Sequence, residues 1–217
     1  LARPRRDAQV HIVDARFHQS YSGIIDADLP QARGTWSDYV VTVLRRMARD
    51  FPGATVGMDA VIGSTLPSAA GLSSSTALVI ASFLPLAAFN RLEARAEWAA
   101  NLASTPQLAG YLGAVENGRA FGTFAADFGV GTQGGAQDHL AILACRQNHL
   151  SQARHLPATI EAEVAFPSDW CFVIASCGVP APKGSRVQER YNALARQTST
   201  LIGAWNSAHD TEHHSLL

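Results

Sequence analysis

Residues 66–77, with the sequence LPSAAGLSSSTA, constrain the fold of this chain more than any other stretch. They join a loop of small residues to three consecutive serines and then to a long apolar run. Small residues let a backbone approach an anion closely, and the first turn of the following helix offers unpaired N–H groups at the positive end of its dipole. The stretch therefore predicts a phosphate-binding loop that opens a buried helix. It is not a Walker A loop, because no lysine lies between Leu66 and Asn90.

A purely structural interpretation of the same stretch also fits. A loop with proline and glycine, followed by a serine N-cap and an ordinary buried helix, has a similar local pattern. The choice between the two interpretations depends on what the rest of the chain contains.

The stretch resembles the second motif of the GHMP small-molecule kinases, the family named for galactokinase, homoserine kinase, mevalonate kinase and phosphomevalonate kinase. That motif reads approximately P-x-x-x-G-L-x-S-S-[AS]. The matching residues are Pro67, Gly71, Leu72, Ser74 and Ser75. Thr76 occupies the slot that Ala or Ser usually holds.

Further segments resemble galactokinase elements in the same order along the chain. Residues 36–40 (WSDYV) resemble the W-x-x-Y-V that opens a helix, and residues 114–116 (AVE) resemble the A-x-E that supplies a magnesium-binding carboxylate. Residues 129–139 (GVGTQGGAQDH) resemble G-x-P-C-G-I-M-D-Q, whose Asp lies next to the attacking sugar hydroxyl. Residues 173–179 and 191–192 resemble a galactokinase strand and the Y-N pair whose Tyr lies at the sugar.

The resemblance implies an α+β GHMP kinase fold, with a ribosomal-protein-S5-domain-2-like N-terminal domain and the start of a ferredoxin-like C-terminal domain. We expect residues 1–160 to belong to the first and residues 161–217 to the second, with the proline-bounded segment 157–169 as the boundary. The implied function is ATP-dependent phosphorylation of a monosaccharide hydroxyl, the anomeric C1 hydroxyl, with ATP and Mg²⁺ as cofactors.

The resemblance also assigns roles to residues of this sequence. Asp138 would be the catalytic base, and a helix N-terminus would favour its ionised form. The implied nucleotide-binding residues are Pro67, Ala70, Gly71, Leu72, Ser73, Ser74 and Ser75. The implied magnesium ligands are Ser75 and Glu116, and the implied sugar-binding residues are Gly134, Gly135, Asp138 and Tyr191.

Each assignment has a structural alternative. Ser75 can simply cap a helix, and Glu116 before Asn117-Gly118 can be an exposed helix end with glycine at its C-cap. Asp138 can be an N-terminal helix carboxylate and no more. Tyr191 can be a core aromatic residue with its hydroxyl at the surface.

The sequence also departs from the galactokinase pattern. Gln137 and His139 replace the Met and Gln that flank the family's Asp, and residues 119–130 lengthen the interval before it, which predicts an inserted loop beside the site. Nothing matches the family's G-E-H-T-D-Y element, the Arg before it, or the glycine-rich third motif. We therefore expect the chain to be the middle of a kinase. The alternative function is a catalytically silent sugar- and ATP-binding sensor, or an inactive fragment of such a kinase.

Composition favours a compact soluble domain. The chain has 217 residues, of which 47% are hydrophobic and 16% charged, with a net charge of −1. We expect a sugar and ATP as its partners, no nucleic acid or membrane, a monomer or weak homodimer, and a cytoplasmic location. The three cysteines, Cys145, Cys171 and Cys177, lack metal-type spacing and predict reduced, mostly buried thiols.

Hydrophobic periodicity predicts the secondary structure. Strands are expected over 8–16, 54–64 and 170–176, the last of them buried. Helices are expected over 36–51, 72–89, 93–103, 106–116 and 185–204. The helix over 72–89 is apolar almost all round, and Pro85 predicts a kink or a late break in it.

Overall fold

A computed structural model describes residues 1–31, 33–66, 71–175 and 185–213 of the chain, with the side chains of 185–188 excepted. In chain order the elements are β1 (Ala2–Pro4), β2 (Gln9–Asp14), β3 (Gln19–Ile24), α1 (Asp38–Asp50), β4 (Met58–Ile62), α2 (Ser74–Phe89), the 3₁₀ turn η1 (Leu92–Ala94), α3 (Ala96–Asn101), α4 (Thr105–Asn117), α5 (Gln137–Ala144), β5 (His149–His155), β6 (Ala158–Ala165) and α6 (Ser185–His209).

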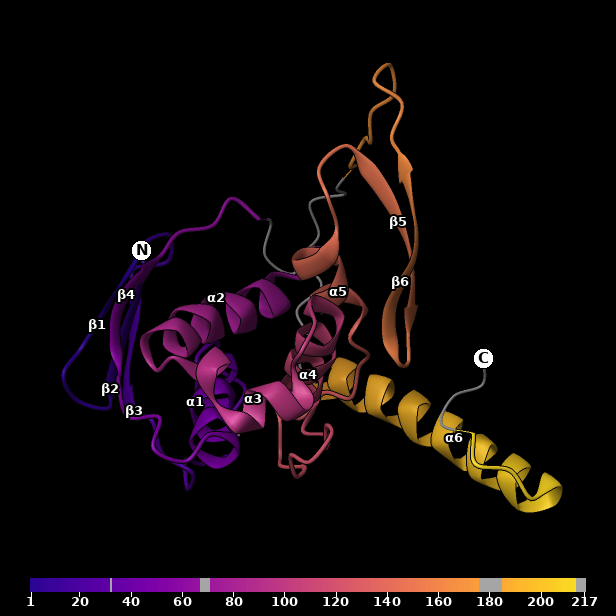
Figure 1. The fold of residues 1–217 in the computed structure, drawn as a ribbon, viewed down its shortest axis with the longest axis horizontal. Helices are drawn as coiled ribbons and strands as arrows, with labels where there is room; N and C mark the ends of the chain where they lie inside the picture. The colour runs from indigo at the N-terminus through magenta and orange to yellow at the C-terminus, as the bar shows by residue number, and fades with distance from the viewer. Residues whose placement is uncertain (32, 67–70, 176–184, 214–217) are drawn as a thin grey trace.

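The first four strands form a mixed sheet in the order β1-β4-β2-β3. β2 pairs antiparallel with β3 and parallel with β4, so that Ile12 lies between Tyr21 and Ala60. Val10 and Ile12 of β2 are buried, whereas the alternate residue His11 is exposed. The helices lie on one side of the sheet (Figure 1), which matches this alternation.

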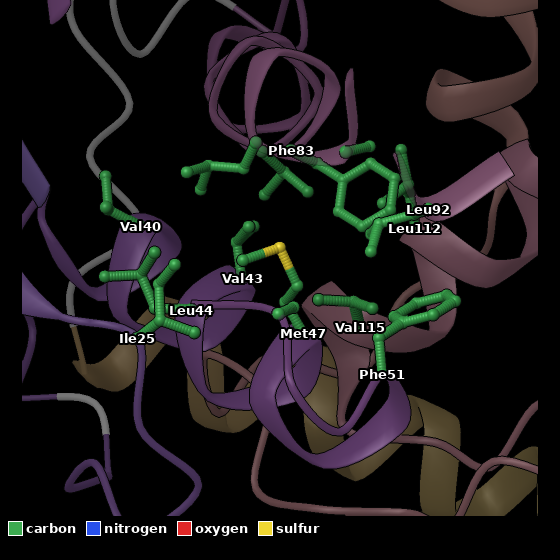
Figure 2. Close-up of a cluster of buried hydrophobic side chains, with 14 of the residues drawn as sticks. Ile25, Val40, Val43, Leu44, Met47, Phe51, Phe83, Leu92, Leu112 and Val115 are labelled. Atoms are coloured by element: carbon green, nitrogen blue, oxygen red, sulfur yellow. The ribbon is translucent and has the colours of Figure 1, made fainter. Parts of the chain in front are cut away.

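The hydrophobic core lies between the sheet and helices α1, α2 and α4. The apolar residues of α1 recur at helical spacing and point toward α2 and α4, with Met47 at the centre of the cluster (Figure 2). Met47, Phe83 of α2 and Leu112 of α4 are each at most 1% exposed. Each such side chain contributes roughly 1.5–3 kcal/mol of burial free energy, so this cluster holds the three helices together.

Helix α1 also buries two arginines. The Arg45 Nε lies 2.7 Å from Asp127 Oδ2, and the two side chains are 1% and 0% exposed. Arg45 also donates to the carbonyl oxygen of Pro30 at 2.8 Å. The next residue, Arg46, pairs with Asp50 one turn further along the same helix, with Nε 3.0 Å from Oδ2. Both ion pairs are enclosed, and the first one ties α1 to the loop that follows α4.

Residues 119–130, where the sequence predicts an inserted loop, form a loop that is hydrogen-bonded to the end of α4. That it is an insertion stays a prediction. Gly118 ends α4 in the left-handed conformation, with φ of 72°. A Cβ there would lie 2.7 Å from the backbone nitrogen of Gly129. The N–H of Val130 donates to the carbonyl oxygen of Glu116 at 2.9 Å. The loop therefore returns the chain to α4 just before the glycine-rich segment.

The expected elements over 8–16, 54–64, 36–51, 106–116 and 185–204 are confirmed as β2, β4, α1, α4 and α6. The helix expected over 72–89 is confirmed as α2, which runs to Phe89 with Pro85 inside it. It is not buried all round, because Leu84 is 39% exposed. The single helix expected over 93–103 is divided into η1 and α3, since Arg95 adopts an extended conformation between them.

The expected buried strand over 170–176 is wrong. Residues 170–175 form no strand, and Ser176 lies outside the described residues. Trp170, Phe172 and Val173 are 68%, 74% and 87% exposed. An apolar run becomes a strand only where a neighbouring strand accepts and donates its backbone hydrogen bonds, and within the described ranges these residues have no such neighbour.

The expectation of mostly buried cysteines is also wrong for the two that the structure describes. Cys145 and Cys171 are both exposed. Cys145 follows the short helix α5, and Cys171 lies in the exposed segment that does not become a strand. Cys177 lies outside the described residues.

Strands β5 and β6 form a separate antiparallel hairpin that rises beside α4 and α5, and α6 runs away from the other helices (Figure 1). β6 lies within the segment 157–169 that was expected as a domain boundary. The division at residue 160 stays a prediction. Within the described residues, no helix combines the length and the apolar character that a membrane span requires.

Candidate active site

The start of α2 presents the predicted phosphate-binding loop. Gly71 has φ of +72°, and Ser73, the N-cap residue, also lies in the left-handed region with φ of 56°. The Ser73 side chain makes no capping hydrogen bond, so it leaves the first-turn N–H groups of α2 without a side-chain partner of that kind. Ser74 and Ser75 form that first turn. The loop thus has the geometry that favours an anion at a helix N-terminus.

Two of the predicted nucleotide-binding residues, Pro67 and Ala70, lie outside the described residues. Leu72 is half-buried just before α2. Ser75 does not cap the helix, because the N-cap position belongs to Ser73.

Glu116 lies in the last turn of α4 and points inward, with only 9% of the residue exposed. Its Oε2 accepts a hydrogen bond from the hydroxyl of Thr76 at 3.3 Å. The same oxygen lies 3.1 Å from His139 Nε2. The structure therefore joins the end of α4 to the first turns of α2 and α5 through one carboxylate.

Tyr39, in the first turn of α1, completes this group of helix ends. Burial raises the pKa of the Tyr39 hydroxyl, the negative charge of Glu116 raises it further, and a hydrogen bond with Ser75 acts against both. The Tyr39 hydroxyl thus interacts with both the Ser75 side chain and the Glu116 carboxylate.

Asp138 is half-buried in the first turn of α5, and His139 beside it is 2% exposed. The glycine-rich approach to α5 is held by two asparagines. The Asn117 side chain accepts from the N–H of Gly134. Asn192 accepts from the N–H of Gln133 and donates to the carbonyl oxygen of Gly131, both at 2.8 Å.

The structure thus places Ser75 directly beside Thr76 and Asp138 directly beside His139, the two residues that contact Glu116. Gly134 and Gly135 are exposed on the segment that leads to Asp138. Tyr191 is 53% exposed on α6, so it is not a core aromatic residue. Its neighbour Asn192 makes the contact with the glycine-rich segment.

Helices α4 and α5 meet at Gly113. A Cβ at Gly113 would lie 2.7 Å from the Cβ of Ala136 and 2.9 Å from its Cα, distances at which something must move. Because Ala136 is the N-cap residue of α5, the close approach at Gly113 sets where Asp138 and His139 lie relative to Glu116.

We expect Gly113→Ala to be less stable than Gly203→Ala by about 1–3 kcal/mol in the free energy of unfolding, measured with urea. Both glycines are helical, so both substitutions gain the same helix propensity, and nothing lies within 4 Å of a Cβ at Gly203. The difference between the two variants therefore isolates the contact with Ala136. Equal stability of the two variants would show that α5 can move away at no cost.

A surface hollow of about 650 Å³ lies elsewhere, between β3 and the start of α1. Asp38 is the carboxylate that lines it. That carboxylate already accepts hydrogen bonds from the backbone N–H groups of Arg33, Gly34 and Thr35. Since that carboxylate is already occupied, we place the candidate site at the helix ends around Glu116.

Several residues of the site were not singled out for it from the sequence: Tyr39, Thr76, Asn117, His139 and Asn192. His139 was noted only as a departure from a family motif, and Thr76 only as an unusual occupant of its slot. Those two departures were the signal, because Thr76 and His139 both contact Glu116.

The residues present fit a magnesium ion. Mg²⁺ prefers oxygen ligands and is usually held by one or two carboxylates or hydroxyls of the protein together with phosphate oxygens. Ser75 and Glu116 supply one hydroxyl and one carboxylate. In the described part of the chain, no hydrogen bond reaches the Glu116 Oε1, whereas Oε2 has two polar neighbours. The described residues contain no group of three or more His, Cys, Asp and Glu side chains that would form an all-protein metal site.

Comparison with known proteins gives a family for part of the chain and a fold for the whole. Residues 38–118 match the family described as GHMP kinases N terminal domain. This range begins with α1 and ends just after Glu116, so it contains the loop before α2 and the carboxylate. A search of curated proteins found no match.

Among solved structures, the chain is similar to the galactokinase of Lactococcus lactis, which was crystallised in complex with galactose. The sequence identity is 16%, and the TM-score is 0.61. The match covers 99% of this chain and 50% of the galactokinase, so this chain spans about half the length of that protein. Residues 38–118 are therefore a GHMP kinase N-terminal domain, within a chain that has a galactokinase-like α+β fold.

Proposed function

We propose that this chain binds Mg²⁺ and ATP and transfers the γ-phosphoryl group to a monosaccharide hydroxyl, the anomeric C1 hydroxyl in the galactokinase manner. The observation that carries the proposal is the convergence on Glu116. One buried carboxylate contacts the first turn of the phosphate-loop helix α2 and the first turn of α5, which also bears Asp138. Phosphoryl transfer needs these parts close together, because catalysis rests on positioning and charge neutralisation.

The loop before α2 is proposed to hold the triphosphate. The backbone N–H groups of its first turn and the hydroxyls of Ser73 and Ser74 are suited to phosphate oxygens. Gly71 lets the backbone come close, since a Cβ there would occupy open space that a phosphate needs. Pro67, Ala70 and Leu72 are proposed to complete the nucleotide site, by their position in the same loop. Ser75 and Glu116 would hold Mg²⁺, which supplies charge neutralisation when bound.

Asp138 is proposed as the base. Its carboxylate accepts the proton of the sugar hydroxyl as that oxygen forms a bond to the γ-phosphorus, and the bond between the γ-phosphorus and the bridging oxygen of ADP breaks. Asp138 lies in the first turn of α5, at the positive end of the helix dipole. Gly134, Gly135 and Tyr191 are proposed to line the sugar, because the two glycines form the exposed approach to Asp138 and Asn192 attaches the helix of Tyr191 to that approach.

The test is ADP release from the 217-residue chain with Mg²⁺ and ATP. The sugars offered are galactose, galacturonate, arabinose and glucuronate, with mevalonate as the acceptor of another branch of the superfamily. Reactions without acceptor and with EDTA give the background. Turnover with one sugar, absent from both background reactions, is the expected result.

Nucleotide binding is measured in parallel by titration calorimetry. Binding of ATP without sugar-dependent ADP release would replace the kinase with the silent sugar- and ATP-binding sensor. A folded sample that binds neither ATP nor sugar would overturn the proposal as a whole.

A further inference from the structure

His139 is a buried side chain that the proposed chemistry does not use. It is 2% exposed, and neither ring nitrogen makes a well-aligned hydrogen bond. Leaving polar nitrogens unpaired in the interior costs free energy, so a buried histidine normally has a partner. The nearest polar group that the structure gives it is the carboxylate of Glu116.

The Glu116 carboxylate is close enough to His139 to be that partner. His139 Nε2 lies 3.1 Å from Glu116 Oε2, which is within hydrogen-bond distance, although the N–H direction is not aligned with the oxygen. The other nitrogen, Nδ1, lies next to Gly113, where a Cβ would approach it to 3.5 Å, so that side of the ring faces backbone.

Thr76, on helix α2, bonds the same Oε2 atom of Glu116. Its hydroxyl donates to Oε2 at 3.3 Å, and it is 3% exposed. Two donors on one oxygen fix the plane of a carboxylate and leave the second oxygen, Oε1, for another ligand. In many proteins, hydrogen-bond donors to a metal-binding carboxylate hold that carboxylate in place. Their loss weakens metal affinity about 10–100-fold.

We propose that His139 is a positioning residue: its Nε2–H, together with the Thr76 hydroxyl, holds Glu116 so that Oε1 is available to Mg²⁺. This inference rests on the proposed function, because it presumes that Glu116 binds Mg²⁺. Because His139 directly follows Asp138 in the chain, its contact with Glu116 has a second consequence. His139 couples the magnesium carboxylate on α4 to the helix turn that carries the proposed base.

The test measures the Mg²⁺ concentration that gives half-maximal binding of ADP to the 217-residue chain, with no turnover involved. His139→Leu fills the buried position with an apolar side chain that has no N–H donor. We therefore expect it to raise the half-maximal Mg²⁺ concentration roughly tenfold. His139→Gln keeps a donor of nearly the same reach and should stay within about threefold of the unaltered chain. Glu116→Gln is the reference for loss of the ligand itself.

The outcomes separate the two ideas. If Glu116→Gln leaves the half-maximal Mg²⁺ concentration unchanged, the proposed magnesium site is wrong. If Glu116→Gln raises it and His139→Leu does not, the site stands and the role of His139 is wrong. Should the leucine variant fail to fold, His139→Asn replaces it, because asparagine is polar but too short to reach Oε2. Equal Mg²⁺ dependence of the Asn and Gln variants would then refute the inference.

Discussion

Asp127→Asn is expected to lower the free energy of unfolding by about 3–5 kcal/mol, because it removes the charge that compensates a fully buried arginine. Arg45 is 1% exposed, and its Nε lies 2.7 Å from Asp127. Asparagine has nearly the same shape, so the loss comes from the charge rather than from packing. Urea denaturation followed by circular dichroism measures it.

The matched control is Glu161→Gln in the β5–β6 hairpin. Arg154 and Glu161 are as close as the buried pair, at 2.6 Å, but their side chains are 62% and 32% exposed. Water screens and solvates such a pair, so its loss should cost no more than about 1 kcal/mol. A similar cost for both substitutions would mean that Asp127 is solvated in the folded protein and that the loop after α4 is not held by this pair.

Asp138→Asn is expected to lower the rate of sugar-dependent ADP release by about 10²–10⁴ while leaving ATP affinity nearly unchanged, because asparagine cannot accept the proton of the attacking hydroxyl. The folded state should lose no more than about 1 kcal/mol, which is the usual contribution of a carboxylate at a helix N-terminus. Steady-state kinetics and nucleotide titration on the same sample separate the two effects.

Glu97→Gln is the matched control for the structural interpretation of Asp138. Glu97 is also a half-buried carboxylate in the first turn of a helix, α3, but it is not among the residues proposed for the site. If Asp138 merely complements a helix dipole, the two variants should behave alike in kinetics as well as in stability. A selective loss of turnover in Asp138→Asn would rule that interpretation out.

The sequence was most informative where local patterns determine structure. Apolar residues at helical spacing gave α1, and a proline in the first turn with a glycine after the last turn gave α4. Alternating apolar positions gave β2 and β4. In each case the deciding interactions lie within a few residues along the chain.

The long-range polar contacts could not be predicted in this way. Thr76, Glu116 and His139 lie far apart in the sequence and meet only when α2, α4 and α5 pack together. Arg45 and Arg46 lie beside the apolar stripe of α1, where charged residues are usually exposed, yet both are buried. Asp127 reaches Arg45 from the loop after α4, and Arg46 pairs with Asp50 of its own helix and donates to the distant carbonyl oxygen of Arg119. The prediction of a buried strand over 170–176 was wrong for a related reason. An apolar run does not reveal whether a partner strand exists.

The contact of Asn192 with the glycine-rich segment allows the movement of α6 relative to that segment to be measured. The backbone N–H of Gln133 bonds the side chain of a residue on α6, so this hydrogen must leave its partner before it can exchange with deuterium. Its exchange rate consequently records how often α6 detaches from the approach to Asp138. One backbone amide thus reports the docking of a whole helix in the resting protein, with no sugar, nucleotide or turnover required.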